Sequence, residues 1–164
     1  MRLYFMRHGE AEERDPHRSD AERALTPQGE DEMRRVAAGV QALKLEFDIL
    51  LSSPLVRARQ TAEHVARTLD IEDRLTLTPV LGGGCRMGDL QTLLKNCSTR
   101  SRVLLIGHEP DFSMLVGSLI GGGIVRIRKA SLACLDVAVV QPGGAELRWL
   151  LNPEHLAALA PAKE

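Results

Sequence analysis

Short apolar runs alternate along the chain with longer segments in which apolar residues recur every three or four positions. Uninterrupted apolar runs of this length are typical of buried strands, and the three-to-four spacing is typical of helices with one buried face. The runs predict strands at residues 2–6, 47–52, 75–81, 103–107, 131–140 and 145–151. The spacing predicts helices at residues 27–44, 53–69, 89–96, 111–120 and 154–159.

Two helix starts carry capping signals. Thr26 precedes Pro27, and Ser53 precedes Pro54. A hydroxyl residue at the N-cap followed by proline in the first turn favours helix initiation, so we expect helices to begin at both places. Residues 9–25 are polar and aperiodic, which predicts a long loop, and long ordered loops are often functional.

Strands that alternate with helices and end in a hairpin predict an α/β fold. We expect a three-layer α/β/α sandwich with a mostly parallel central sheet and a C-terminal antiparallel hairpin that turns at residues 142–144. With 164 residues, the chain is predicted to form a single domain over residues 1–164.

Composition narrows the class of protein. The net charge of -1 gives no electrostatic reason to expect a nucleic-acid or membrane partner, and an aromatic content of 3% leaves little stacking surface for single strands. The three cysteines are odd in number and lack paired spacing, which argues against disulfides and zinc. No signal peptide or spanning stretch is evident, so we expect a cytoplasmic protein.

Three predicted strands end in residues that carry chemistry. The first is followed by Arg7, His8 and Gly9, the second leads to Arg57, and the third is followed by His108. The carboxyl ends of parallel strands meet at one edge of a sheet, so these side chains should lie together. A lone histidine more often merely ends a strand, but two histidines and two arginines indicate a site.

The clustered side chains favour a phosphoryl group as ligand. Groups of like charge are costly to bury together unless an anion holds them, and arginine matches phosphate oxygens bidentately. Arg57 also falls in the first turn of a predicted helix, whose positive end attracts anions. The arginines should lower the pKa of a neighbouring histidine, so that its neutral imidazole could act as a nucleophile.

Four ordered motifs resemble those of the histidine phosphatase superfamily, which includes phosphoglycerate mutases and acid phosphatases. They are RHG at residues 7–9, LTPQG at 25–29, SPLVRARQTA at 53–62 and GH at 107–108. The resemblance covers residues 1–120, and the short chain is similar to the SixA-type phosphohistidine phosphatases. It implies a phosphoglycerate mutase-like fold.

The resemblance also implies roles for single residues. His8 would be the nucleophile that becomes phosphorylated, and Arg7, Arg57 and His108 would bind the phosphoryl oxygens, with no metal or other cofactor. Glu109 is the best-placed carboxylate for a general acid, although a solvated loop carboxylate is an equal interpretation. His108, Glu109 and Asp111 are candidate metal ligands, but the nearby arginines argue against the binding of a cation there. Arg14, Arg18 and Arg86 lie in loops that could reach the pocket, but a solvated surface position is the better interpretation.

These implications predict a metal-independent hydrolase that acts through a phosphohistidine intermediate, most simply on phosphohistidine of another protein. Two alternatives stay open. One is a phosphatase for a small metabolite, such as a sugar or nucleotide phosphate. The other is a module that binds phosphoryl groups without hydrolysing them, although such a module does not need the nucleophile His8.

Overall fold

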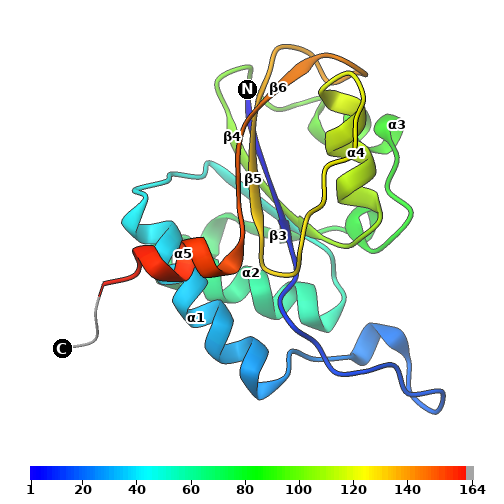
Figure 1. Ribbon diagram of the computed structural model, residues 1–164. Coiled ribbons are helices and arrows are strands. Elements are labelled where there is room, and N and C mark those ends of the chain that lie inside the picture. The colour runs from blue at the N-terminus through cyan, green and yellow to red at the C-terminus, as the bar shows by residue number, and fades with distance from the viewer. Residues whose placement is uncertain (162–164) are drawn as a thin grey trace.

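A six-stranded sheet in the order β3-β2-β4-β1-β5-β6 forms the centre of the molecule (Figure 1). The computed structural model describes residues 1–161. The strands are β1 (Arg2–Arg7), β2 (Ile49–Ser52), β3 (Leu75–Leu77), β4 (Arg102–Gly107), β5 (Leu132–Val137) and β6 (Ala145–Leu151). The first four strands run parallel, and β5 is antiparallel to both of its neighbours. The mostly parallel sheet with a C-terminal hairpin is confirmed.

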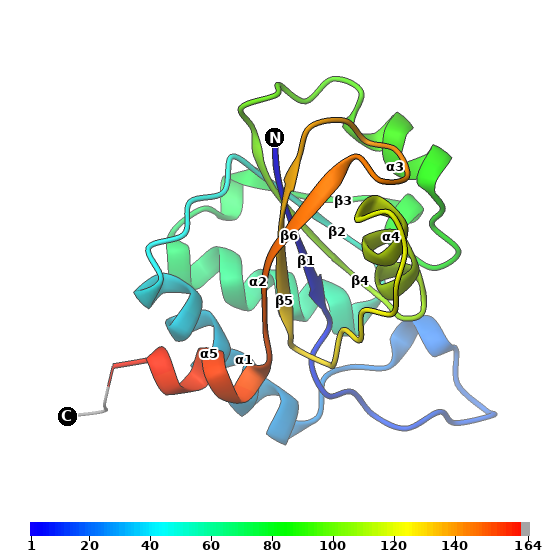
Figure 2. The ribbon, with the colours of Figure 1, turned by 45° about the horizontal axis from the view of Figure 1, so that its top comes forward.

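Helices cover both faces of the sheet (Figure 2). They are α1 (Pro27–Ala42), α2 (Val56–Leu69), α3 (Met87–Leu94), α4 (Asp111–Leu119) and α5 (Pro153–Leu159). Alternate residues of β1 enter two separate cores: Tyr4 packs on the side of α1, α2 and α5, and Phe5 packs on the side of α3 and α4. Because side chains alternate along a strand, the uninterrupted apolar runs supply both cores. The three-layer α/β/α sandwich is therefore confirmed.

Strands β1, β4 and β2 end side by side at one edge of the sheet. Arg7 of β1 lies beside Gly107 of β4, and Ser52 of β2 lies beside Ile106. The residue after each strand extends the ladder by one bond: His8 N donates to Gly107 O at 3.1 Å, and Ser53 N donates to Ile106 O at 2.9 Å. The chain therefore leaves three neighbouring strands at the same level.

The Ser53-Pro54 signal is not a helix start, and this prediction was wrong. Helix α2 begins at Val56 with Leu55 at the N-cap position. Ser53 instead continues the strand, and its hydroxyl accepts a hydrogen bond from Leu55 N at 3.2 Å. The Thr26-Pro27 signal is confirmed, because Thr26 Oγ1 accepts from Gly29 N at 3.0 Å.

Several predicted bounds also shift. The strand predicted at 75–81 ends at Leu77 because Pro79 begins a 3-10 turn, and the strand predicted at 131–140 ends at Val137. The helix predicted at 89–96 lies two residues earlier along the chain. The predicted single domain of residues 1–164 includes residues 162–164, which lie outside the described part of the chain.

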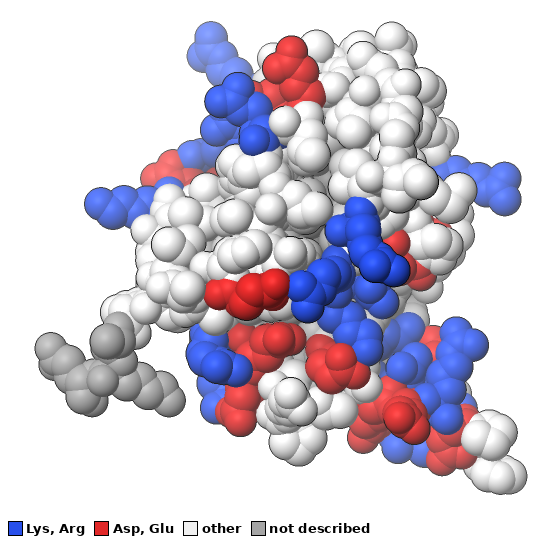
Figure 3. Space-filling model, in the orientation of Figure 1, with Lys and Arg blue, Asp and Glu red and all other residues white. Residues whose placement is uncertain are grey.

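The predicted loop at residues 9–25 crosses the edge of the sheet where β1 ends (Figure 2). A bridge between Ala11 and Leu25 closes its base, and a short 3-10 helix covers Asp20–Glu22. On the face shown in Figure 3, acidic and basic side chains are interleaved in the lower part of the molecule, where this loop lies. Within residues 1–161, no helix is both long enough and apolar enough to cross a bilayer.

Candidate active site

His8 lies directly after β1, with only 7% of its surface exposed. Its Nδ1 is 2.7 Å from the carbonyl oxygen of Gly9, and its Nε2 is 3.3 Å from Nε of Arg57. A carbonyl can only accept a hydrogen bond and an arginine can only donate one. Nδ1 therefore carries the proton of the neutral ring, and Nε2 presents its lone pair toward Arg57.

Arg57 reaches the same place from the first turn of α2. The residue is 6% exposed, and all three nitrogens of its guanidinium group donate hydrogen bonds. Nε donates to His8, Nη1 donates to Asp20 O at 2.7 Å, and Nη2 donates to Asp20 Oδ2 at 2.9 Å. Thr61, one turn further along α2, accepts from Gly9 N at 3.0 Å and donates to Arg57 O at 2.7 Å. This hydroxyl ties the helix to the end of β1.

His108 follows β4 and lies opposite His8. The two ring centroids are 5.1 Å apart, with the planes inclined at 55°. Nε2 of His108 lies 2.7 Å from the hydroxyl of Ser53, and both residues are buried. Among residues 1–161, Nδ1 of His108 is buried without a hydrogen-bond partner. Sequence reasoning missed this use of Ser53, because Ser-Pro is also the signal of a helix start.

Arg7 brings the second guanidinium to the site from the last position of β1. Its Nη1 donates to Ile127 O at 3.2 Å, which fixes the side chain against the segment before β5. Its Nε is buried and has no partner among the described residues. Buried polar atoms are nearly always hydrogen-bonded, so two unpartnered nitrogens in one site indicate that a polar ligand completes it.

Burial is the main cause of the electrostatic state of both histidines. It lowers the pKa of His8 to about 3, and the charges of His108, Arg57 and Arg7 act in the same direction. It lowers the pKa of His108 to about 4, with help from Arg57 and Arg7. The arginines therefore contribute as expected, but loss of hydration is the larger effect. Both imidazoles are neutral at pH 7.

Glu109 stands next to His108 but is engaged at the start of α4. Its Oε1 accepts a hydrogen bond from Ser113 N at 3.2 Å, and its charge raises the pKa of Arg7 against the lowering effect of burial. Asp111 turns to Cys85, whose backbone N–H it accepts at 3.0 Å. Within the described part of the chain, no three His, Cys, Asp or Glu side chains are grouped closely enough to hold a metal ion.

The three arginines predicted to lie in loops differ in their contacts. Arg14 and Arg18 pair with carboxylates of their own loop, Asp20 and Glu12, each at 3.4 Å. Arg86 lies at the N-cap of α3 with its side chain exposed. Asp20, which sequence reasoning did not single out, is the loop residue that contacts Arg57. Only the length of its loop hinted at a function.

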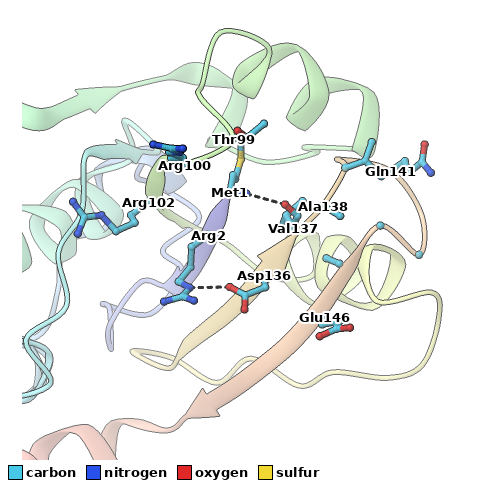
Figure 4. Close-up of a pocket in the computed structure, with 14 residues that line it drawn as sticks. Met1, Arg2, Thr99, Arg100, Arg102, Asp136, Val137, Ala138, Gln141 and Glu146 are labelled. Atoms are coloured by element: carbon cyan, nitrogen blue, oxygen red, sulfur yellow. Dashed lines mark hydrogen bonds and ion pairs between the residues drawn. The ribbon is translucent and has the colours of Figure 1, made fainter.

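A cavity of about 780 Å³ lies elsewhere, at the opposite edge of the sheet, where β1 begins (Figure 4). There the amino group of Met1 donates to Val137 O at 2.9 Å, and Arg2 pairs with Asp136 at 2.8 Å. The basic and acidic groups in this cavity are partly paired with each other, and the histidine pair lies at the other end of β1.

Comparison with known proteins identifies the family. Residues 3–81 match the model of the histidine phosphatase superfamily (branch 1). The phosphohistidine phosphatase SixA of Escherichia coli K12 is 30% identical over 158 residues, which cover 95% of this chain and 96% of SixA. The chain belongs to the histidine phosphatase superfamily.

Solved structures of other histidine phosphatases have the same fold as this chain. The structure of the protein histidine phosphatase SixA complexed with tungstate has a TM-score of 0.83 and 29% identity, and covers 95% of this chain and 99% of that one. The α-ribazole phosphatase of Shigella flexneri has a TM-score of 0.68 at 19% identity, covering 93% and 97%, and shows the same fold. The likeness to SixA supports phosphatase activity.

Proposed function

We propose that this histidine phosphatase hydrolyses phosphohistidine on a protein through a covalent intermediate on His8. The observation that carries the proposal is the ring state of His8: a neutral imidazole with its lone pair on Nε2, in a buried site with Arg7, Arg57 and His108. A nucleophile needs an unprotonated nitrogen at working pH, and burial supplies it.

In the first step, Nε2 of His8 attacks phosphorus and the bond from phosphorus to the leaving group breaks. A leaving oxygen takes a proton from a general acid, whereas a phosphohistidine ring that is already protonated on its other nitrogen leaves as neutral imidazole. In the second step, water attacks the same phosphorus, the bond to Nε2 breaks, and inorganic phosphate leaves. Arg57 and the unpartnered nitrogens of Arg7 and His108 stabilise the charge on the phosphoryl oxygens in both steps.

A protein substrate is supported by two relatives, the phosphohistidine phosphatase SixA and the protein histidine phosphatase SixA solved with tungstate. A phosphoryl group on a protein side chain is attached to a bulky body. The chain matches SixA almost end to end, so no large insertion encloses the site.

The three cysteines are free thiols, from which we also infer a reducing cytoplasmic setting.

Glu109 is proposed as the general acid for leaving groups that need one. An imidazole leaving group is already protonated near neutral pH and departs without such help, whereas an alkoxide requires a proton. The carboxyl group of Glu109 directly follows His108 in the chain and lies near Arg7. Its contact with Ser113 N leaves one carboxylate oxygen, Oε2, outside that hydrogen bond.

The test compares a histidine-phosphorylated protein with a panel of sugar and nucleotide monophosphates. We expect kcat/KM for the phosphohistidine protein to exceed that for every small phosphate by about 100-fold or more, and His8→Ala to remove turnover of all of them. A preference for a small phosphate would favour the metabolite phosphatase. Tight phosphate binding without any turnover would favour the binding module.

A further inference from the structure

Arg57 forms an ion pair with Asp20 of the long loop at residues 9–25. The carboxylate and the backbone carbonyl of Asp20 together hold both terminal nitrogens of the guanidinium group. The side chain of Arg57 is 7% exposed and that of Asp20 is 42% exposed, so the acid lies on the solvent side of the pair. Buried guanidinium groups are paired in proteins, and here the partner comes from a loop.

The loop holds this carboxylate firmly. Oδ1 of Asp20 accepts from Arg23 at 2.8 Å and lies 3.4 Å from Nε of Arg14. Arg23 is itself anchored by a 2.7 Å bond from its Nε to Glu12 O. The hydrogen bonds from Arg23 and Arg57 lower the pKa of Asp20 to about 2, so the residue is an anion throughout the neutral range.

This arrangement conflicts with a phosphoryl group on His8. The Nε2 lone pair that now accepts the N–H of Arg57 becomes the bond to phosphorus, so the guanidinium must turn to the phosphoryl oxygens. Asp20 accepts from both terminal nitrogens of Arg57, so a phosphoryl group that binds Arg57 bidentately has to share those nitrogens with the carboxylate or displace it. A carboxylate beside a phosphoryl dianion is also repelled by it.

We propose that Asp20 is the resident counter-anion of Arg57, displaced when a phosphoryl group binds and restored when inorganic phosphate leaves. Asp20 acts through Arg57 and is thus a positioning residue whose effect is to weaken retention of the product. The proposal deepens the proposed function, since it requires that phosphoryl oxygens bind Arg57. It assigns a role to the loop at residues 9–25.

The test is the dissociation constant of inorganic phosphate, measured by calorimetry at fixed ionic strength. Asp20→Asn keeps the shape and removes the charge. We expect it to bind phosphate at least about fivefold more tightly than the unaltered protein, because the competing charge-assisted bond is weakened. Tungstate, measured in the same way, should respond in the same direction.

Glu22→Gln is the matched control, because it removes the same charge from the same exposed 3-10 turn two residues away. It should change phosphate affinity by less than about twofold, as expected for a solvated surface charge. If Asp20 merely supported the structure, its loss would loosen Arg57 and weaken phosphate binding. Unchanged or weaker binding by Asp20→Asn therefore overturns the proposal.

A second variant tests whether the effect passes through Arg57. In an Arg57→Lys background, Asp20→Asn should alter phosphate affinity by less than about twofold, because the bidentate partner is gone. An undiminished gain there would contradict the proposal. If Asp20→Asn binds phosphate more tightly but the protein does not hydrolyse phosphohistidine, only the proposed substrate is rejected. Absence of phosphate binding to both the unaltered protein and Asp20→Asn would reject this inference and the anion site alike.

Discussion

The Nε2 of His108 lies 2.7 Å from the hydroxyl of Ser53, although 55 residues separate them in the chain. The contact joins the ends of β2 and β4, which are neighbours in the sheet. It fixes the plane of an imidazole whose other nitrogen has no partner within residues 1–161. A ring held in this way can present Nδ1 to a phosphoryl oxygen without first losing rotational freedom.

Ser53→Ala should therefore slow the reaction. Loss of one buried hydrogen bond to the ring is expected to reduce kcat about tenfold, with KM changed less. Steady-state kinetics on a phosphorylated substrate measures this. Ser131→Ala is the control, because Ser131 is equally buried but its hydroxyl bonds to Asn152 outside the site. Full activity in Ser53→Ala would show that the contact does not position His108.

Glu109→Gln should separate two kinds of leaving group. Hydrolysis of a phosphate monoester should fall about 100-fold, since an alkoxide needs the proton that a general acid supplies. Turnover of phosphohistidine should stay within about threefold, because imidazole leaves already protonated. Glu13→Gln, an exposed carboxylate of the long loop, should affect neither substrate. An equal loss on both substrates would argue for a structural role at the start of α4.

The buried histidines should make the fold sensitive to acid. Below pH 6.5 the unfolded chain protonates both rings, whereas the native pKa values of about 3 and about 4 keep them neutral. The unfolded state then binds more protons, so the free energy of unfolding falls as pH falls from about 6.5 toward 4.

Urea unfolding at several pH values measures this slope. Between about pH 6 and pH 5, each histidine should account for about 1 kcal/mol of the loss. His108→Gln should therefore lose about 1 kcal/mol less than the unaltered protein over that interval. Identical slopes for the two proteins would mean that His108 is protonated in the native state.

Much of the site could be predicted because its residues follow the clearest strands. His8 and His108 directly follow apolar runs, and Arg57 lies in the first turn of the helix that follows a third run. Neighbouring parallel strands bring these positions together at one edge of the sheet. Ser53 was misassigned because a serine before proline has the same local pattern whether it caps a helix or extends a strand. The tertiary bond from Ser53 N to Ile106 O decided between them.

Thr61 and Asp20 could not be found from the sequence. Thr61 occurs within a helix, where a polar residue is ordinarily solvent-facing, and its partner Gly9 is 52 residues away. Asp20 lies in an aperiodic loop whose path the hydrophobic pattern does not determine. Its contact with Arg57 spans 37 residues, and only the three-dimensional structure brings the loop over the end of β1.

The most direct test of the account is to trap the phosphorylated protein. The chain is mixed with a radiolabelled phosphohistidine protein, quenched in alkali where phosphohistidine survives, and digested to locate the label and its ring position. We predict label on Nε2 of His8, and none in His8→Asn. Label on Nδ1 of His8, label on another residue, or turnover without any trapped label in the unaltered protein would contradict the mechanism.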